Sequence, residues 1–170
     1  MTQQSNRKGS ALVSVVSDTA YEVERKFDAS AEAVFRALTE PELIKRWWGF
    51  PTGRWVECVA DVRPGGHWRN AVVEGEHEVF FHGRYVEVDR PRRLVHTEVF
   101  EGLPGGGPDV DEPSTLVTTE LTEEGGVTTM RVHVECDSPE VLQGILATGM
   151  ETGMQLSYDR LEDLLPGLAA

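Results

Sequence analysis

Apolar and polar residues alternate with period two along much of the chain between residues 21 and 136, which is typical of strands half-buried in a sheet. The alternation predicts a strand over residues 21–27. Turn residues delimit six further candidate strands, over residues 54–62, 67–74, 78–88, 93–101, 115–123 and 127–136. Short segments rich in Gly, Pro, Asp and Glu separate most of the later strands. Because such short connections join antiparallel neighbours, we expect an antiparallel meander.

Helical periodicity appears in three places. Ser30 is a plausible N-cap for a short helix, and a second short helix begins near Pro41 and ends at Gly49. Ser138-Pro139 opens the third segment, where apolar residues recur at helical spacing until Pro166-Gly167. We therefore predict one continuous helix over residues 139–164.

A single α+β domain accounts for these elements, because a sheet and a long helix must bury their apolar faces on each other. We expect this domain to cover residues 18–166 and residues 1–17 to be a disordered tail, although the apolar run 11–16 is also compatible with an extension of the first strand. The loop 102–113 is rich in Gly and Pro, and we expect it to be mobile or to act as a lid over a binding site.

Composition excludes several classes of protein. The chain has 170 residues and a net charge of −13, which opposes binding to nucleic acid or to anionic membranes. No apolar run is long enough to span a membrane, and the polar N-terminus is unlike a secretory signal. Cys58 and Cys136 form no CxxC motif, which favours reduced thiols and a cytoplasmic location.

Two motifs carry a family resemblance. They are Asp61-Val62-Arg63-Pro64-Gly65-Gly66-His67-Trp68 and, upstream of it, Leu43-Ile44-Lys45-Arg46-Trp47-Trp48-Gly49. In their order and spacing, these motifs and the segments 25–29, 34–39, 81–88, 91–95, 149–154 and 159–161 resemble the prokaryotic relatives of the activator of heat-shock protein 90 ATPase. Those proteins belong to the START-like (SRPBCC, birch-pollen-allergen-like) superfamily of hydrophobic-ligand-binding domains.

The resemblance implies a helix-grip fold, in which a curved antiparallel sheet wraps around a C-terminal helix. It also implies a cavity for a small hydrophobic molecule between the two. The eukaryotic activators carry an additional N-terminal domain that contacts the chaperone. Nothing in this sequence corresponds to that domain, so we do not expect chaperone activation.

No recognised catalytic or metal motif is present. The five histidines (His67, His77, His82, His96 and His133) have no ligand spacing with one another or with cysteine. No nucleophile elbow, phosphate-binding loop or dinucleotide fingerprint follows a strand. We therefore assign no catalytic residue and expect neither a metal nor a cofactor.

Small residues recur along one face of the predicted C-terminal helix, at Gly149, Gly153 and Ser157. Glycine inside a helix costs roughly 1 kcal/mol relative to alanine, so the two glycines require a reason. They allow either close packing of the helix on a strand or a cavity bordered by the adaptable side chains of Met150 and Met154.

Aromatic residues divide between core and pocket in the same way. Trp48, at the end of the short helices, and Trp68, after the Gly turn, are the strongest pocket candidates, because an indole combines a large apolar surface with an N–H donor. The candidate ligand-binding residues are Trp48, Trp68, Phe81, Tyr85, Met150, Gly153 and Met154. Arg25 shares the parity of Tyr21, Val23 and Phe27, so it is expected to point inward and to form an ion pair.

The leading hypothesis is non-enzymatic binding of a small hydrophobic or amphipathic molecule between the sheet and the C-terminal helix. Two alternatives stay open: an enzyme resembling polyketide cyclases and dehydratases, and a co-chaperone-like protein-interaction module. A homodimer is also left open.

Overall fold

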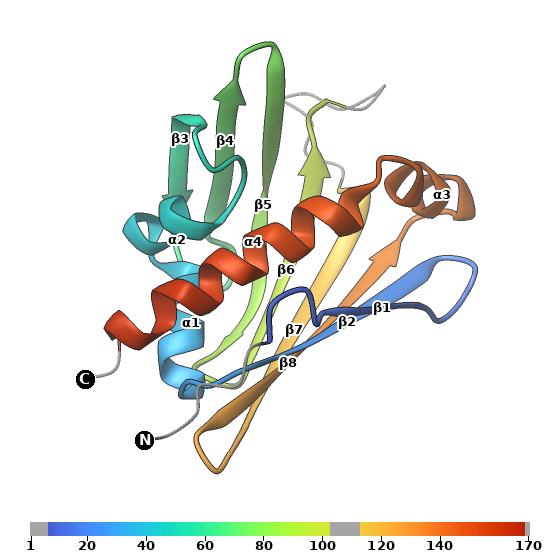
Figure 1. The fold of residues 1–170 in the computed structure, drawn as a ribbon. Coiled ribbons are helices and arrows are strands. Elements are labelled where there is room, and N and C mark those ends of the chain that lie inside the picture. Colours follow the sequence, from blue (N-terminus) through green and yellow to red (C-terminus); the bar gives the residue numbers. More distant parts are fainter. Residues whose placement is uncertain (1–6, 103–112, 169–170) are drawn as a thin grey trace.

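A computed structural model describes residues 7–102 and 113–168 of the chain. In this part, eight antiparallel strands form one curved sheet in the order β1-β2-β8-β7-β6-β5-β4-β3 (Figure 1). The strands are β1 (Leu12–Val15), β2 (Ala20–Phe27), β3 (Arg54–Ala60), β4 (His67–Glu74), β5 (His77–Asp89), β6 (Arg93–Phe100), β7 (Thr115–Glu124) and β8 (Val127–Cys136). The helices are α1 (Ala31–Thr39), α2 (Pro41–Trp47), α3 (Pro139–Ala147) and α4 (Met150–Leu164), and a 3₁₀ turn, η1 (Leu165–Leu168), follows. The antiparallel meander from β3 to β8 and the α+β helix-grip fold are as predicted.

The sheet buries one face against the helices, which we call the inner face. In β2, Tyr21, Val23 and Phe27 are buried in the core, whereas Glu22 and Glu24 between them point to the other side. Matching rows continue across the sheet, because Tyr21 pairs with Val134 and Val134 with Val117. Period-two alternation therefore places one apolar row after another beneath α4.

The structure of the N-terminal segment contradicts part of the prediction that residues 1–17 form a disordered tail. Leu12–Val15 forms β1, which pairs antiparallel with β2, so a tail as far as Ser17 is wrong for these residues. A side chain far along the chain holds the segment in place: the Gln155 amide of α4 accepts from the Ala11 N–H at 3.1 Å and donates to the Ala11 carbonyl at 2.7 Å. Residues 1–6 lie outside the described residues, as do residues 103–112 of the expected lid.

The short helices close one end of the grip. The Ser30 hydroxyl caps α1 by accepting from the Ala33 N–H at 3.1 Å, and Pro41 occupies the first turn of α2, as predicted. Arg160 of α4 donates to the Trp47 carbonyl at the end of α2, at 3.0 Å from Nε and 2.7 Å from Nη2. This contact joins α4 to the short helices.

The C-terminal helix is broken, so the prediction of one continuous helix over 139–164 is wrong. α3 ends at Ala147, and Gly149 has a φ of 71°, a left-handed conformation that a helix interior does not contain. The break lets the two parts take different directions: α3 lies at one end of the sheet, and α4 crosses its concave side (Figure 1).

Candidate functional site

The side of α4 that faces the sheet carries Met150, Met154 and Tyr158 at four-residue spacing, hence on one face of the helix. All three pack against the hydrophobic core but remain partly exposed. Closer to the C-terminus of α4, Leu161 and Leu164 are buried. The N-terminal half of α4 thus leaves apolar surface beside the core that a small molecule could cover.

Four partly exposed aromatic side chains lie close together in a second apolar area. We call Trp48, Trp55, Phe81 and Phe100 the aromatic cluster. The Trp48 ring lies 5.7 Å from Trp55 and 5.7 Å, edge to face, from Phe81, and Phe81 stacks on Phe100 at 4.7 Å between centroids. Trp48 and Phe81 therefore lie together, and that they line one binding site stays a prediction.

Trp68 and Tyr85, the next two candidates, are buried in the core. The Trp68 indole N–H donates to the Thr97 carbonyl at 3.2 Å, so its polar group already has a partner. Gly83 allows this contact, because a Cβ there would lie 1.9 Å from the Thr97 oxygen and 2.8 Å from the indole nitrogen. These two aromatic residues are therefore core residues, unlike the partly exposed Trp48 and Phe81.

Gly153 is exposed, and a Cβ at this position would meet no heavy atom within 4 Å. Close packing of the glycine face on a strand is therefore wrong. Gly149 is explained by the helix break described above. That Gly153 leaves room for a bound molecule stays a prediction.

Glu98 lies on the inner face of β6 and is a candidate site residue that the sequence pattern alone does not single out. Glu98 shares strand parity with Leu94, His96 and Phe100, which indicates that it faces the same side of the sheet. A glutamate is nevertheless most often a surface residue, so parity alone does not identify it as part of a site. Within the described ranges, its carboxyl group has neither a hydrogen bond nor an ion pair, and burial raises its pKa to about 7. A carboxyl group that titrates near neutral pH and lacks a partner is typical of a functional position.

Groups from three other elements lie near Glu98. They are Tyr21 of β2, Cys136 of β8 and Tyr158 of α4. Burial raises the pKa of each of them, and the Glu98 charge adds to the rise. The pKa of Tyr158 reaches about 12 and that of Cys136 about 11, so both stay protonated at neutral pH. The surroundings of Glu98 are therefore uncharged hydroxyl and thiol groups.

His96 and Arg25 add no free positive charge. His96 lies 5.1 Å from the Trp68 ring, and burial lowers its pKa to about 4, so the imidazole is neutral at neutral pH. Arg25 is fully buried, as its parity predicted, and forms ion pairs with Asp159 at 2.9 Å and Glu162 at 3.1 Å. The predicted structural ion pair of Arg25 is thus confirmed.

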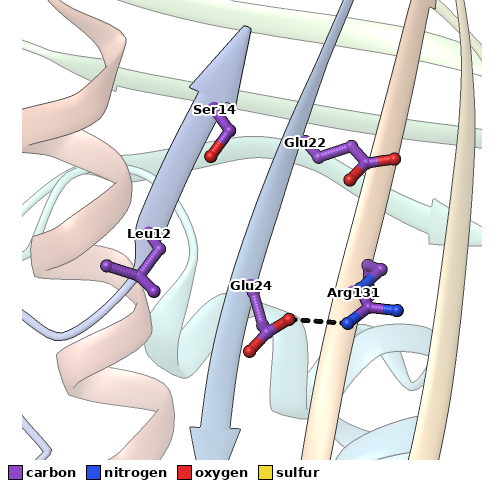
Figure 2. Close-up of a pocket in the computed structure, with 5 residues that line it drawn as sticks. All are labelled: Leu12, Ser14, Glu22, Glu24 and Arg131. Carbon is purple, nitrogen blue, oxygen red and sulfur yellow. Dashed lines mark hydrogen bonds and ion pairs between the residues drawn. The ribbon is translucent and has the colours of Figure 1, made fainter. Parts of the chain in front are cut away.

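A hollow of about 190 Å³ lies on the opposite face of the sheet, which we call the outer groove. Figure 2 shows its lining of Leu12, Ser14, Glu22, Glu24 and Arg131, with Arg131 paired to Glu24 at 2.7 Å. The outer groove contains none of the predicted ligand-binding residues. Its polar lining of paired charges does not suit an apolar molecule.

Two further properties concern the described residues as a whole. They contain no cluster of three or more His, Cys, Asp or Glu side chains that could hold a metal ion. Among their helices, none is long and apolar enough to cross a membrane.

Comparison with known proteins agrees with this architecture. Over residues 28–166 the chain matches the family model described as "Activator of Hsp90 ATPase homolog 1-like protein", and it belongs to this family. No protein among the curated ones matches.

Solved bacterial proteins share the fold. A protein from Rhodobacter sphaeroides is 29% identical, with a TM-score of 0.80 over 94% of this chain and 99% of its own. One from Nitrosomonas europaea is 24% identical, with a TM-score of 0.75 over 90% of this chain and 97% of its own. One from Mycobacterium smegmatis is 20% identical, with a TM-score of 0.77 over 93% and 100%.

Proposed function

We propose that this protein binds a small amphipathic molecule between the inner face of the sheet and α4, without transforming it. One observation carries the proposal: partly exposed apolar side chains of α4 and of the aromatic cluster occur together with an inner-face carboxyl group that has no partner in the described residues. A site with much apolar surface and few polar groups is typical of small-molecule binding.

The proposed ligand contacts follow from this arrangement. Met150 and Met154 adapt to the shape of an apolar body, because the methionine side chain is flexible and polarizable. Trp48 and Phe81 supply rigid aromatic surface. Each Å² of apolar surface removed from water contributes roughly 25 cal/mol, so covering a few of these side chains is enough for measurable affinity.

The cellular context is part of the proposal. Cys58 and Cys136 are both unpaired in the structure. Free thiols suit a reducing compartment, and we propose a cytoplasmic protein whose partner is a small molecule.

Native mass spectrometry of the protein purified from its own host tests the proposal. We expect a non-covalent adduct of small-molecule mass that is lost on collisional activation. As a second readout, the neutral fluorescent probe N-phenyl-1-naphthylamine should bind with increased emission, and Met154→Asp should weaken its binding while an exposed control, Glu78→Gln, leaves it unchanged. Absence of both the adduct and probe binding contradicts the proposal.

A second candidate function is supported by Glu98 itself. A carboxyl group with a pKa of about 7 is suited to general acid–base catalysis, as an enzyme resembling polyketide cyclases or dehydratases requires. The two functions are distinguished by incubating the identified ligand with the protein. Binding alone returns the molecule unchanged, whereas catalysis returns a product and stops in Glu98→Gln.

A further inference from the structure

The carboxyl group of Glu98 lies on the inner face and has no hydrogen-bond or ion-pair partner among the described residues. Thr115 of β7 lies opposite it in the sheet, and Cys136 of β8 lies opposite Thr115. The Glu98 charge raises the pKa values of Tyr21 of β2 and Tyr158 of α4, so both phenol groups lie in its vicinity. Within the described residues, the Glu98 carboxyl group forms no hydrogen bond with any of these groups, so it remains available as an acceptor.

Positive charge to balance an anionic ligand is lacking among the described residues around Glu98. Arg25, the cation that acts on Tyr158, is already paired with Asp159 and Glu162. A ligand carboxylate or phosphate placed here would lie beside a carboxyl group with no compensating cation, and this like-charge contact is unfavourable.

A ligand ammonium group has the opposite effect. It provides three donors and a positive charge, and the Glu98 carboxylate is an acceptor for a charge-assisted hydrogen bond. The phenol oxygens of Tyr21 and Tyr158 are further acceptors nearby. The site therefore complements a cationic amine attached to an apolar body.

We infer that the inner-face site selects amphipathic molecules with a primary amine head group over molecules with the same apolar tail and a hydroxyl or carboxylate head. This inference rests on the proposed function, since it requires that the inner face binds a small molecule at all.

Displacement of N-phenyl-1-naphthylamine by decylamine, decanol and decanoate tests the inference, because the three compounds share one tail. We expect decylamine to compete roughly ten- to a hundred-fold better than decanol, which is the range expected for one hydrogen-bonded ion pair. Decanoate should compete least.

The matched variants separate the site from the general charge of the protein, whose net charge of −13 attracts any amine. Glu98→Gln and Glu78→Gln each remove one negative charge, but Glu78 is exposed on β5. We expect Glu98→Gln to reduce the amine preference to within a fewfold of one, with decanol binding retained, and Glu78→Gln to keep the preference. Retained decanol binding also shows that Glu98→Gln is folded.

A pH series provides a readout independent of the variants. Of the titratable groups around Glu98, Tyr21, Tyr158 and Cys136 titrate far above neutral pH and His96 at about 4. An alkylamine stays protonated to about pH 10, so the amine preference of the wild type should rise between about pH 5 and about pH 9 as Glu98 ionises.

The outcomes are distinguishable. If the probe and decanol bind but decylamine has no advantage, or if Glu98→Gln keeps that advantage, the inference is overturned while the proposed function stands. If none of the compounds binds the wild-type protein, the proposed function fails and the inference fails with it.

Discussion

Replacing Glu98 by glutamine should stabilise the protein at neutral and alkaline pH, although it alters the centre of the candidate site. Glutamine has nearly the same shape as a glutamate side chain and cannot ionise. The carboxylate, by contrast, must lose its hydration on the inner face, and no described group compensates it, which is why its pKa is raised to about 7.

The sign and size of the effect follow from proton linkage. An unfolded chain releases the Glu98 proton near its ordinary value of 4.5, whereas the folded protein keeps it until about pH 7. Between these values the unfolded state binds fewer protons, so stability falls as pH rises, and the loss is complete above about pH 7. A shift of this size corresponds to about 3 kcal/mol at most, and because Glu98 is partly exposed we expect about 1–3 kcal/mol.

Urea unfolding followed by tryptophan fluorescence measures the difference at several pH values. We expect Glu98→Gln to be more stable than the wild type above about pH 7 and equal to it near pH 4.5. Other acidic groups cancel in this comparison because both proteins contain them. Glu78→Gln, the exposed control, should change stability by less than about 0.5 kcal/mol at any pH. A destabilised Glu98→Gln, or a difference that does not vary with pH, would refute the reasoning.

Three further predictions concern stability. Gly153→Ala should stabilise the protein by about 0.5–1 kcal/mol, because the new Cβ enters open space within a helix. Gly149→Ala should destabilise it by about 1–2 kcal/mol, because Gly149 has a left-handed backbone conformation. Equal urea midpoints for the two variants would contradict this prediction. Arg25→Ala should cost about 3–5 kcal/mol, since it leaves two carboxylates without their cation, and a loss below about 1 kcal/mol in thermal or urea unfolding would show the ion pairs to be unimportant. Gly83→Ala should cost more than about 2 kcal/mol and alter the near-UV circular dichroism of Trp68, because the new methyl group collides with the Thr97 carbonyl; an unchanged spectrum and stability would exclude that collision.

Most of the sheet was predictable because its strands are half-buried and therefore alternate. The predicted boundaries of β4 and β8 agree with the structure, and those of the other predicted strands differ by one or two residues. β1 was not predictable in this way. It is a four-residue edge strand whose position depends on pairing with β2 and on two hydrogen bonds between Ala11 and Gln155. Local sequence does not contain these contacts.

The C-terminal helix shows the limit of periodicity. Apolar residues on both sides of Gly149 keep a helical spacing, so the pattern is the same for one helix or two. The left-handed conformation of Gly149 separates α3 from α4. This conformation depends on the packing of the two helices in the folded protein, which the apolar spacing does not specify.

The candidate site was partly predictable. Residue type predicted Trp48, Phe81, Met150 and Met154 as site candidates, since they are large aromatic residues and methionines. In the structure these four side chains are partly exposed beside the core. Glu98 was missed because its importance depends on the absence of a partner, and absence of a partner is a property of the folded chain.

The most direct test of the account is to map a bound probe by NMR, following the backbone amide signals during titration with N-phenyl-1-naphthylamine. Binding between the sheet and α4 predicts that the largest shifts occur at Phe81, Glu98, Met150 and Met154, with little change at the outer groove. Shifts concentrated at the residues of the outer groove, or no shifts at saturating probe, would contradict it.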